Sequence, residues 1–225
     1  QLLDHKVSDT TMRARRDEWI AAGVFQRLID EALSAFDRII GLDLSDTAVD
    51  GSLQKAPCGG EGTGPNPCDR GKLGWKWSML TEAHGIPLGF ELDGANRQDM
   101  VMLAATLDDV DRLGLLVEID TLRLDRGYDN NMVRAVCAQR GLTDLEIAPK
   151  RKTHARKGTR RTPIRQQLGR RRIIERTNSW LTNYGQMRRN TDRRTDHRLA
   201  QLQLVCALVI TIKLIDWRNR WSPIR

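Results

Sequence analysis

The order of apolar segments along the chain limits the fold more than any other feature. Residues 5–39 repeat apolar side chains at helical spacing, and strand-like segments follow within residues 41–92. Helix and strand patterns then alternate up to residue 148, and two more helices are expected near the C-terminus. Strands followed by helix–strand alternation favour a mixed sheet, antiparallel first and parallel later, with helices packed on it. We therefore predict an α/β fold with helical N- and C-terminal extensions.

The expected elements have approximate bounds. Strands are predicted at 41–50, 75–81, 86–92, 115–125 and 145–148, and helices at 100–113, 130–140, 163–187 and 199–217. A Gly- and Pro-rich stretch at 57–74 predicts an irregular loop, and residues 150–163 predict a basic loop.

Two aspartates have the same sequence context. Asp50 and Asp125 each end an apolar segment, and a glycine follows at once or after one residue. Residues just beyond strand ends face the crevice where ligands bind in open α/β sheets. A single aspartate at such a place more often forms a turn, but two on strands that can be neighbours favour a metal site.

The third candidate acid is Glu175. On a helix of 100° per residue it lies at the centre of the polar face, opposite the apolar face. A glutamate that is simply solvent-exposed is the alternative. Glu175 is, however, the only acid between residues 150 and 191, a strongly basic part of the chain. Asp69, Asp93 and Asp99 are the next candidates, although turn or cap roles are expected for them.

The net charge of +8 comes from one block. Residues 150–172 hold eleven basic residues and no acid, which leaves 26 basic and 29 acidic residues elsewhere. Such a block favours a polyanionic partner, namely DNA, RNA or an acidic membrane surface. A solvated basic loop without a partner is the alternative.

The cysteines and the apolar segments indicate in which compartment of the cell the protein occurs. The four cysteines show no CxxC pair, which predicts reduced thiols in a cytoplasmic protein. The most apolar stretch, residues 202–215, is shorter than a membrane span and predicts a buried helix. Because the chain begins at Gln1 in mid-pattern, we expect an upstream portion to be missing.

Three carboxylates suit the cutting of a phosphodiester. The reaction needs an activated water and stabilisation of charge on the leaving oxygen, and two divalent ions about 4 Å apart provide both. Mg²⁺ prefers oxygen ligands, so carboxylates from different elements suffice. In this scheme one aspartate bridges both ions, while the other aspartate and Glu175 each complete one site.

Four segments together resemble bacterial insertion-sequence transposases of the DDE type. They read DTAVDGS, GGEGTGPNPCDRGKLGWKWSMLTEAHGIPLGFELDGANRQD, LRLDRGYDNNMVR and RRIIERTNSWLTNYGQMRRNTDRR. The resemblance implies that Asp50, Asp125 and Glu175 form the acidic triad of an RNase H-like domain that uses two Mg²⁺ or Mn²⁺ ions. It also implies hydrolysis of DNA at transposon ends, joining of the freed 3′ hydroxyl to target DNA, and a homodimer in the active complex.

The resemblance also implies a division of the chain and a compartment. Residues 1–40 would be the helical tail of an N-terminal DNA-recognition region, 41–217 the catalytic domain and 218–225 a C-terminal tail. Such a protein would be cytoplasmic, associated with the nucleoid and not bound to a membrane. One departure is visible around the third acid, where related transposases often carry Tyr, Arg, Glu and Lys. Arg171 matches the Arg, but Leu168 and Thr182 stand at the Tyr and Lys positions.

Several residues are candidates for contacts with DNA. Trp75 and Trp77 could stack on an unpaired base beside Lys72 and Lys76, although packing in the core is an equally good interpretation of both tryptophans. Phosphate contacts are expected from basic side chains. These are Arg126, Lys150, Arg151, Arg171, Arg172, Arg188 and Arg189.

Two rival functions stay open. One is a nuclease of the same fold that cuts DNA without strand transfer, and the other is a truncated, non-catalytic remnant that binds DNA. Substitution of an acid discriminates between an enzyme and a binder, because only the enzyme then loses cleavage. A basic protein of the membrane surface is a more distant alternative, since no basic amphipathic helix with an aromatic face is evident.

Overall fold

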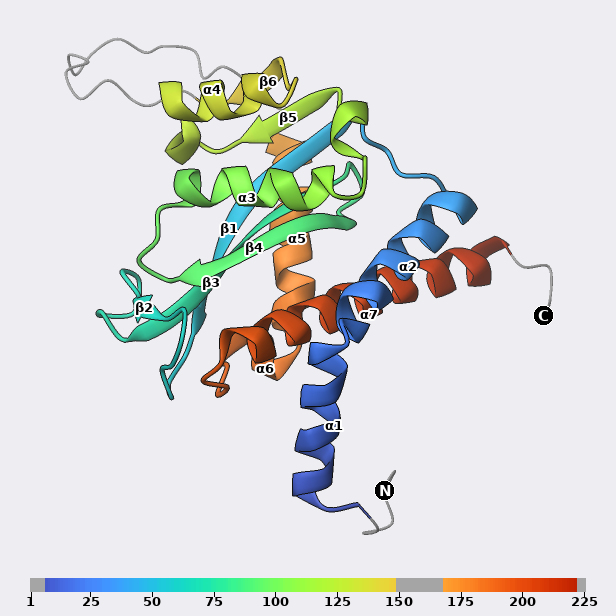
Figure 1. Cartoon of the computed structure of the whole chain (residues 1–225). Coiled ribbons are helices and arrows are strands. Elements are labelled where there is room, and N and C mark those ends of the chain that lie inside the picture. Colours follow the sequence, from blue (N-terminus) through green and yellow to red (C-terminus); the bar gives the residue numbers. More distant parts are fainter. Residues whose placement is uncertain (1–6, 149–167, 222–225) are drawn as a thin grey trace.

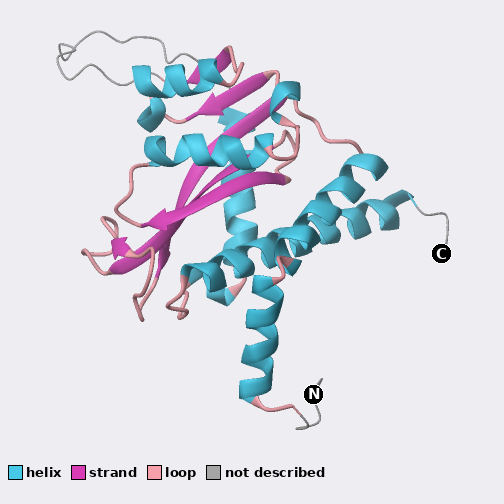
Figure 2. Ribbon diagram, in the orientation of Figure 1, coloured by secondary structure: helices cyan, strands magenta, loops and turns pink. Residues whose placement is uncertain are grey.

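The protein folds around one mixed sheet (Figures 1 and 2). The computed structural model describes residues 7–148 and 168–221, and only the backbone of 168–172. The strands are β1 (Asp46–Lys55), β2 (Gly64–Pro65), β3 (Leu73–Thr81), β4 (Pro87–Gly94), β5 (Thr121–Leu124) and β6 (Asp144–Ile147). β3 pairs antiparallel with β1, β2 and β4, whereas β5 pairs in parallel with β1 and β6. The predicted mixed sheet, antiparallel first and parallel later, is confirmed.

Helices cover both faces of this sheet. In Figure 1, α3 (Asp99–Asp111) and α4 (Asn131–Gln139) lie in front of the strands, and α5 (Leu168–Thr182) lies behind them. Two short 3₁₀ turns, η1 (Leu116–Glu118) and η2 (Arg126–Tyr128), flank β5. The Asn130 side chain caps α4 by accepting a hydrogen bond from the Met132 amide, which ends the loop after η2.

The remaining helices lie beside the sheet, except for the first, which projects from it. They are α1 (Asp9–Ala21), α2 (Val24–Ile39), the one-turn helix α6 (Gly185–Arg188) and α7 (Thr195–Trp221). α2 packs along α7 and buries Ile29, Leu33 and Phe36 in the same core as the strands. α1 has no buried residue and projects from the body (Figure 1). The core therefore takes in α2, although the expected catalytic domain begins at residue 41.

α7 is long and apolar enough to cross a membrane by length and composition. The same properties describe a core helix, and ten of its residues are buried in this fold, including Leu202 and Ile210. Its packing against α2 agrees with the predicted buried helix.

Several predicted boundaries were wrong, and one example is the strand expected at 115–125, which begins only at Thr121. Two others concern the elements that carry Asp50 and Glu175. β1 does not end at Asp50 but continues to Lys55, because β3 pairs with it along that whole length. The helix that carries Glu175 stops at Thr182 rather than near residue 187. The chain turns there, and the short helix α6 begins at Gly185.

One buried hydrogen bond ties α5 to the sheet. The Thr177 hydroxyl donates to the Gly85 carbonyl over 2.7 Å, and Thr177 is fully buried. Gly85 has φ +90°, and an added Cβ would lie 2.6 Å from the Thr177 Oγ1, so the hairpin before β4 and the helix meet closely.

We expect Thr177→Val to lower the free energy of unfolding by about 1–3 kcal/mol, because the buried Gly85 carbonyl loses its donor. Urea denaturation followed by circular dichroism measures this change. Thr182→Val is the matched control, since the Thr182 hydroxyl bonds only the local Ser179 carbonyl near the end of the same helix. Equal effects of the two variants would contradict the anchoring role.

Candidate active site

Asp50 and Asp125 lie side by side where β1 extends beyond the end of β5. The parallel pairing of the two strands stops at Val49 and Leu124, and each aspartate is the next residue. β1 then continues against β3 alone, with Asp50 opposite Met79. The sequence placed both acids at strand ends. In the structure only Asp125 follows a strand end. Asp50 lies within β1, at the point where β5 no longer pairs with it.

Both aspartates belong to the same face of the sheet. Ala48 on β1 pairs with Arg123 on β5. Asp50 comes two residues after Ala48, and Asp125 comes two residues after Arg123. Because side chains alternate between faces with a period of two, Asp50 and Asp125 point to the same side. The Asp50 Oδ1 accepts a hydrogen bond from the Gly51 amide over 2.9 Å, and the Asp125 Oδ1 accepts one from the Arg126 amide. Both side chains are half-buried, and each is oriented by the amide of the residue that follows it.

Acidic residues affect the pKa of one buried tyrosine near the candidate site. Tyr128, in η2, is 1% exposed. Burial raises the pKa of Tyr128, and the carboxylates of Asp99, Asp50 and, more weakly, Asp125 raise it further. Three carboxylates therefore influence this one side chain, and Glu175 is not among them.

Glu175 lies on the helix that covers the face of Asp50. Ser52 shares this face and pairs with Trp77, whose indole N–H donates to the Asn178 Oδ1 on α5 over 2.8 Å. Glu175 precedes Asn178 by one helical turn, so the two residues lie on the same side of α5. The side chain of Glu175 is exposed. The structure thus places Glu175 on the same side of the sheet as both aspartates.

The three candidate acids do not form a closed cluster. Within residues 7–148 and 173–221, no three side chains of Asp, Glu, His or Cys are close enough together to hold a metal ion. The pairing of β1 with β5 brings Asp50 and Asp125 together, whereas Glu175 lies on α5, which packs over the same face of the sheet. The donors are carboxylate oxygens, the type that Mg²⁺ and Mn²⁺ prefer, so the pair of aspartates fits such an ion.

Comparison with known proteins decides the family. Residues 41–212 match the family model described as the transposase DDE domain. The chain belongs to this family. The mixed sheet flanked by helices that was expected for such a domain is confirmed.

Three known proteins show how far the similarity extends. A putative transposase for the insertion sequence element IS402 of Burkholderia cepacia is 35% identical over 153 residues, which are 65% of this chain and 67% of the relative. The catalytic domain of the Mos1 mariner transposase has 11% identity over 92% of this chain and 97% of its own, with a TM-score of 0.32. The Mos1 paired-end complex with the left transposon end has 13% identity, covers 67% of this chain and has a TM-score of 0.31. This chain spans 45% of that protein's length.

The expectation that Trp75, Lys76 and Trp77 of this transposase domain contact DNA was wrong. Both tryptophans are at most 1% exposed, and their rings meet edge to face at 5.4 Å. Lys76 is 5% exposed, and its ammonium group bonds within the protein. The alternative interpretation of the tryptophans, packing in the core, holds because β3 is buried on both faces along most of its length.

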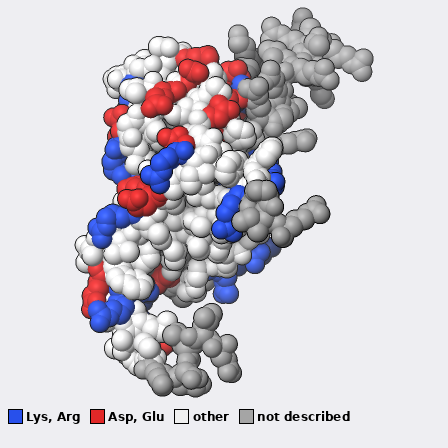
Figure 3. Space-filling model, turned by 90° about the vertical axis from the view of Figure 1, so that its right-hand side faces the viewer, with Lys and Arg blue, Asp and Glu red and all other residues white. Residues whose placement is uncertain are grey.

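Four of the other expected DNA-contacting residues are accessible. Lys72, Arg126, Arg188 and Arg189 are exposed. Lys150 and Arg151 lie outside the described residues, as do the side chains of Arg171 and Arg172. On the face shown in Figure 3, the described basic and acidic side chains are interspersed. Contacts with phosphates by the four exposed residues stay a prediction.

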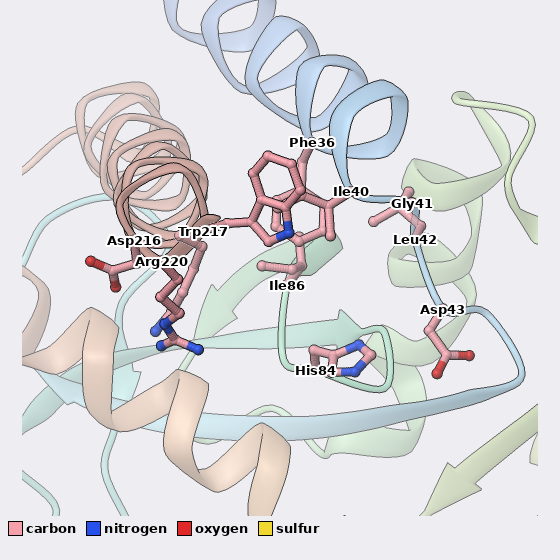
Figure 4. Close-up of a pocket in the computed structure, with 11 residues that line it drawn as sticks. Phe36, Ile40, Gly41, Leu42, Asp43, His84, Ile86, Asp216, Trp217 and Arg220 are labelled. Carbon is pink, nitrogen blue, oxygen red and sulfur yellow. The ribbon is translucent and has the colours of Figure 1, made fainter. Parts of the chain in front are cut away.

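A cavity of about 520 Å³ lies away from the candidate acids (Figure 4). The end of α2, the hairpin before β4 and the end of α7 enclose it, with Phe36, His84, Trp217 and Arg220 among its lining residues. None of the three candidate acids lines it. We keep the candidate active site at the sheet, because the carboxylates of the candidate acids supply the oxygen ligands that a divalent ion prefers.

The sequence reasoning missed an ion pair beside the candidate site. The Lys76 Nζ lies 2.6 Å from the Asp99 Oδ1, and an added Cβ at Gly51 would lie 2.2 Å from that same oxygen. A lysine within the apolar stretch WKWSML was the available signal, because a buried ammonium group requires a partner.

Proposed function

We propose that this chain is the catalytic part of an insertion-sequence transposase. It would cut DNA at transposon ends and join the freed 3′ hydroxyl to target DNA, with Asp50, Asp125 and Glu175 holding divalent metal ions. The observation that carries the proposal is the pair Asp50 and Asp125, side by side on one face of the sheet in a member of the transposase DDE domain family.

Each residue has a distinct part in this proposal. Asp50 and Asp125 are held in direction by the amides that follow them, so their carboxylates are oriented before DNA binds. Glu175 would supply the third carboxylate from α5 by movement of its exposed side chain. Mg²⁺ or Mn²⁺ bound there supplies an activated water and neutralises charge on the leaving oxygen.

The exposed cations would hold the substrate. Lys72, Arg126, Arg188 and Arg189 can pair with phosphates, and such contacts make DNA binding strongly dependent on salt. Arg126 directly follows Asp125, so a phosphate bound by it would lie next to the acids. Two chains in a homodimer would provide one site for each transposon end.

Removal of divalent metal is expected to abolish both reactions. With EDTA, the rate of cleavage of a plasmid that carries candidate transposon ends should fall by about 1000-fold or more. The loss of a single charge-stabilising group already lowers a rate by about 100-fold to 1000-fold. Mg²⁺ or Mn²⁺ should restore it. A pre-cut labelled end with a free 3′ hydroxyl should become joined to a target plasmid under the same conditions.

The assay separates the rival functions. Cleavage without joining would identify a nuclease that lacks strand transfer. DNA binding with neither reaction in either metal would identify a non-catalytic remnant. Cleavage that persists in EDTA would overturn the metal assignment.

A further inference from the structure

Lys76 is a buried lysine with two internal partners. Its side chain is 7% exposed, and the ammonium group donates to the Asp99 Oδ1 over 2.6 Å and to the Arg97 carbonyl over 2.9 Å. Burial of an ammonium group is costly unless it is paired and hydrogen-bonded. The pair therefore fixes the start of α3, where Asp99 is the first helical residue.

Asp99 lies directly against the backbone of β1. An added Cβ at Gly51 would be 2.2 Å from the Asp99 Oδ1 and 2.9 Å from its Cγ. The position therefore requires glycine as long as the carboxylate stays in place. Gly51 is the residue after Asp50, so the contact is one residue away from a candidate metal ligand.

Asp99 and Asp50 act on β1 from opposite faces. Gly51 pairs with Ser78 and Leu53 with Lys76, so Lys76 belongs to the Gly51 face. The Thr106 hydroxyl of α3 donates to the Ser78 Oγ over 2.8 Å, which shows that this is the face α3 covers. Asp50 points to the other face because side chains alternate along a strand. Asp99 thus reaches the candidate site through the backbone.

We propose that Asp99, held by Lys76, is a positioning residue that fixes the backbone of β1 at Gly51 and so the direction of the Asp50 carboxylate. This inference rests on the proposed function, in which Asp50 is a metal ligand. A role for Asp99 as a metal ligand itself is less favoured by its contacts, since an ammonium group 2.6 Å away occupies its Oδ1. The surroundings of Tyr128 support the proposal, since Asp99, Asp50 and Asp125 all affect this one buried side chain.

The test measures metal dependence separately from turnover. In the full chain we expect Asp99→Asn to weaken Mn²⁺ binding by calorimetry about 10-fold or more, the effect typical of residues that orient metal ligands. The Mn²⁺ concentration for half-maximal cleavage should rise by the same factor. The cleavage rate at saturating Mn²⁺ and the DNA affinity should stay near wild type.

A second variant covers the case in which Asp99→Asn does not fold. Lys76→Met replaces the buried ammonium group with an apolar chain of similar length, and the Asp99 side chain, 42% exposed, can then be hydrated. It should weaken Mn²⁺ binding in the same direction. Asp108→Asn is the matched control, because Asp108 is also an acid on α3, and its ion pair with Arg140 lies elsewhere.

The outcomes keep the two proposals apart. Wild-type protein that binds Mn²⁺ but does not cut DNA overturns the proposed function, while the affinities of the variants still test the positioning role. Metal affinity and half-saturation within about twofold of Asp108→Asn, in either Asp99→Asn or a folded Lys76→Met, overturn the positioning role. Absence of Mn²⁺ binding by the wild type also overturns it, since no metal ligand is then being positioned.

Discussion

Replacing Asp50 or Asp125 by asparagine is expected to lower the rate of DNA cleavage by about 100-fold to 1000-fold, the loss typical of a single charge-stabilising group. Asparagine has nearly the same shape but removes the negative charge that a divalent ion requires. The side-chain oxygen can still accept the hydrogen bond from the following amide, so fold and DNA affinity should change little. Glu175→Gln is expected to cause a loss of similar size.

The assay combines cleavage of end-bearing DNA, DNA binding and urea denaturation for each variant. Asp120→Asn is the matched control, because Asp120 is an exposed aspartate that directly precedes β5 at the end away from Asp125. Full cleavage by Asp50→Asn or Asp125→Asn would refute the assignment of that residue. Full cleavage by Glu175→Gln alone would refute the assignment of Glu175 and leave that of the two aspartates in place.

Local sequence patterns predicted most of the architecture. The strand–helix alternation predicted the mixed sheet that the structure has. The proximity of Asp50 and Asp125 was expected from apolar segments that can be neighbouring strands, although only Asp125 follows a strand end. These results depend on neighbours in sequence or on one simple rule of pairing.

Features that depend on pairing between distant segments were not predictable in the same way. The length of β1 depends on β3, which continues the pairing to Lys55 after β5 has ended. The contact between Asp99 and Gly51 joins residues 48 apart in the sequence and needs the start of α3 to meet β1. No periodicity in one segment contains that information.

The tryptophans of β3 show how two physical interpretations of one pattern are separated. Trp77 is fully buried, packs against Trp75 and bonds to Asn178 on α5. We expect Trp77→Ala to lower the free energy of unfolding by about 3–5 kcal/mol, because a large cavity forms in the core. Trp77→Phe should cost less, since the ring fills most of the space while the bond to Asn178 is lost. Urea denaturation of the full chain measures both.

Trp221→Ala provides the control, because Trp221 is 73% exposed at the end of α7 and its removal should change the free energy of unfolding by less than about 0.5 kcal/mol. DNA affinity must be measured under conditions where each variant is folded. If Trp77→Ala kept its stability but bound DNA more weakly, the tryptophan would contact a base and the burial of β3 would be wrong. A loss of stability with unchanged affinity of the folded protein identifies Trp77 as a core residue, in agreement with its contact with α5 on the face of Asp50.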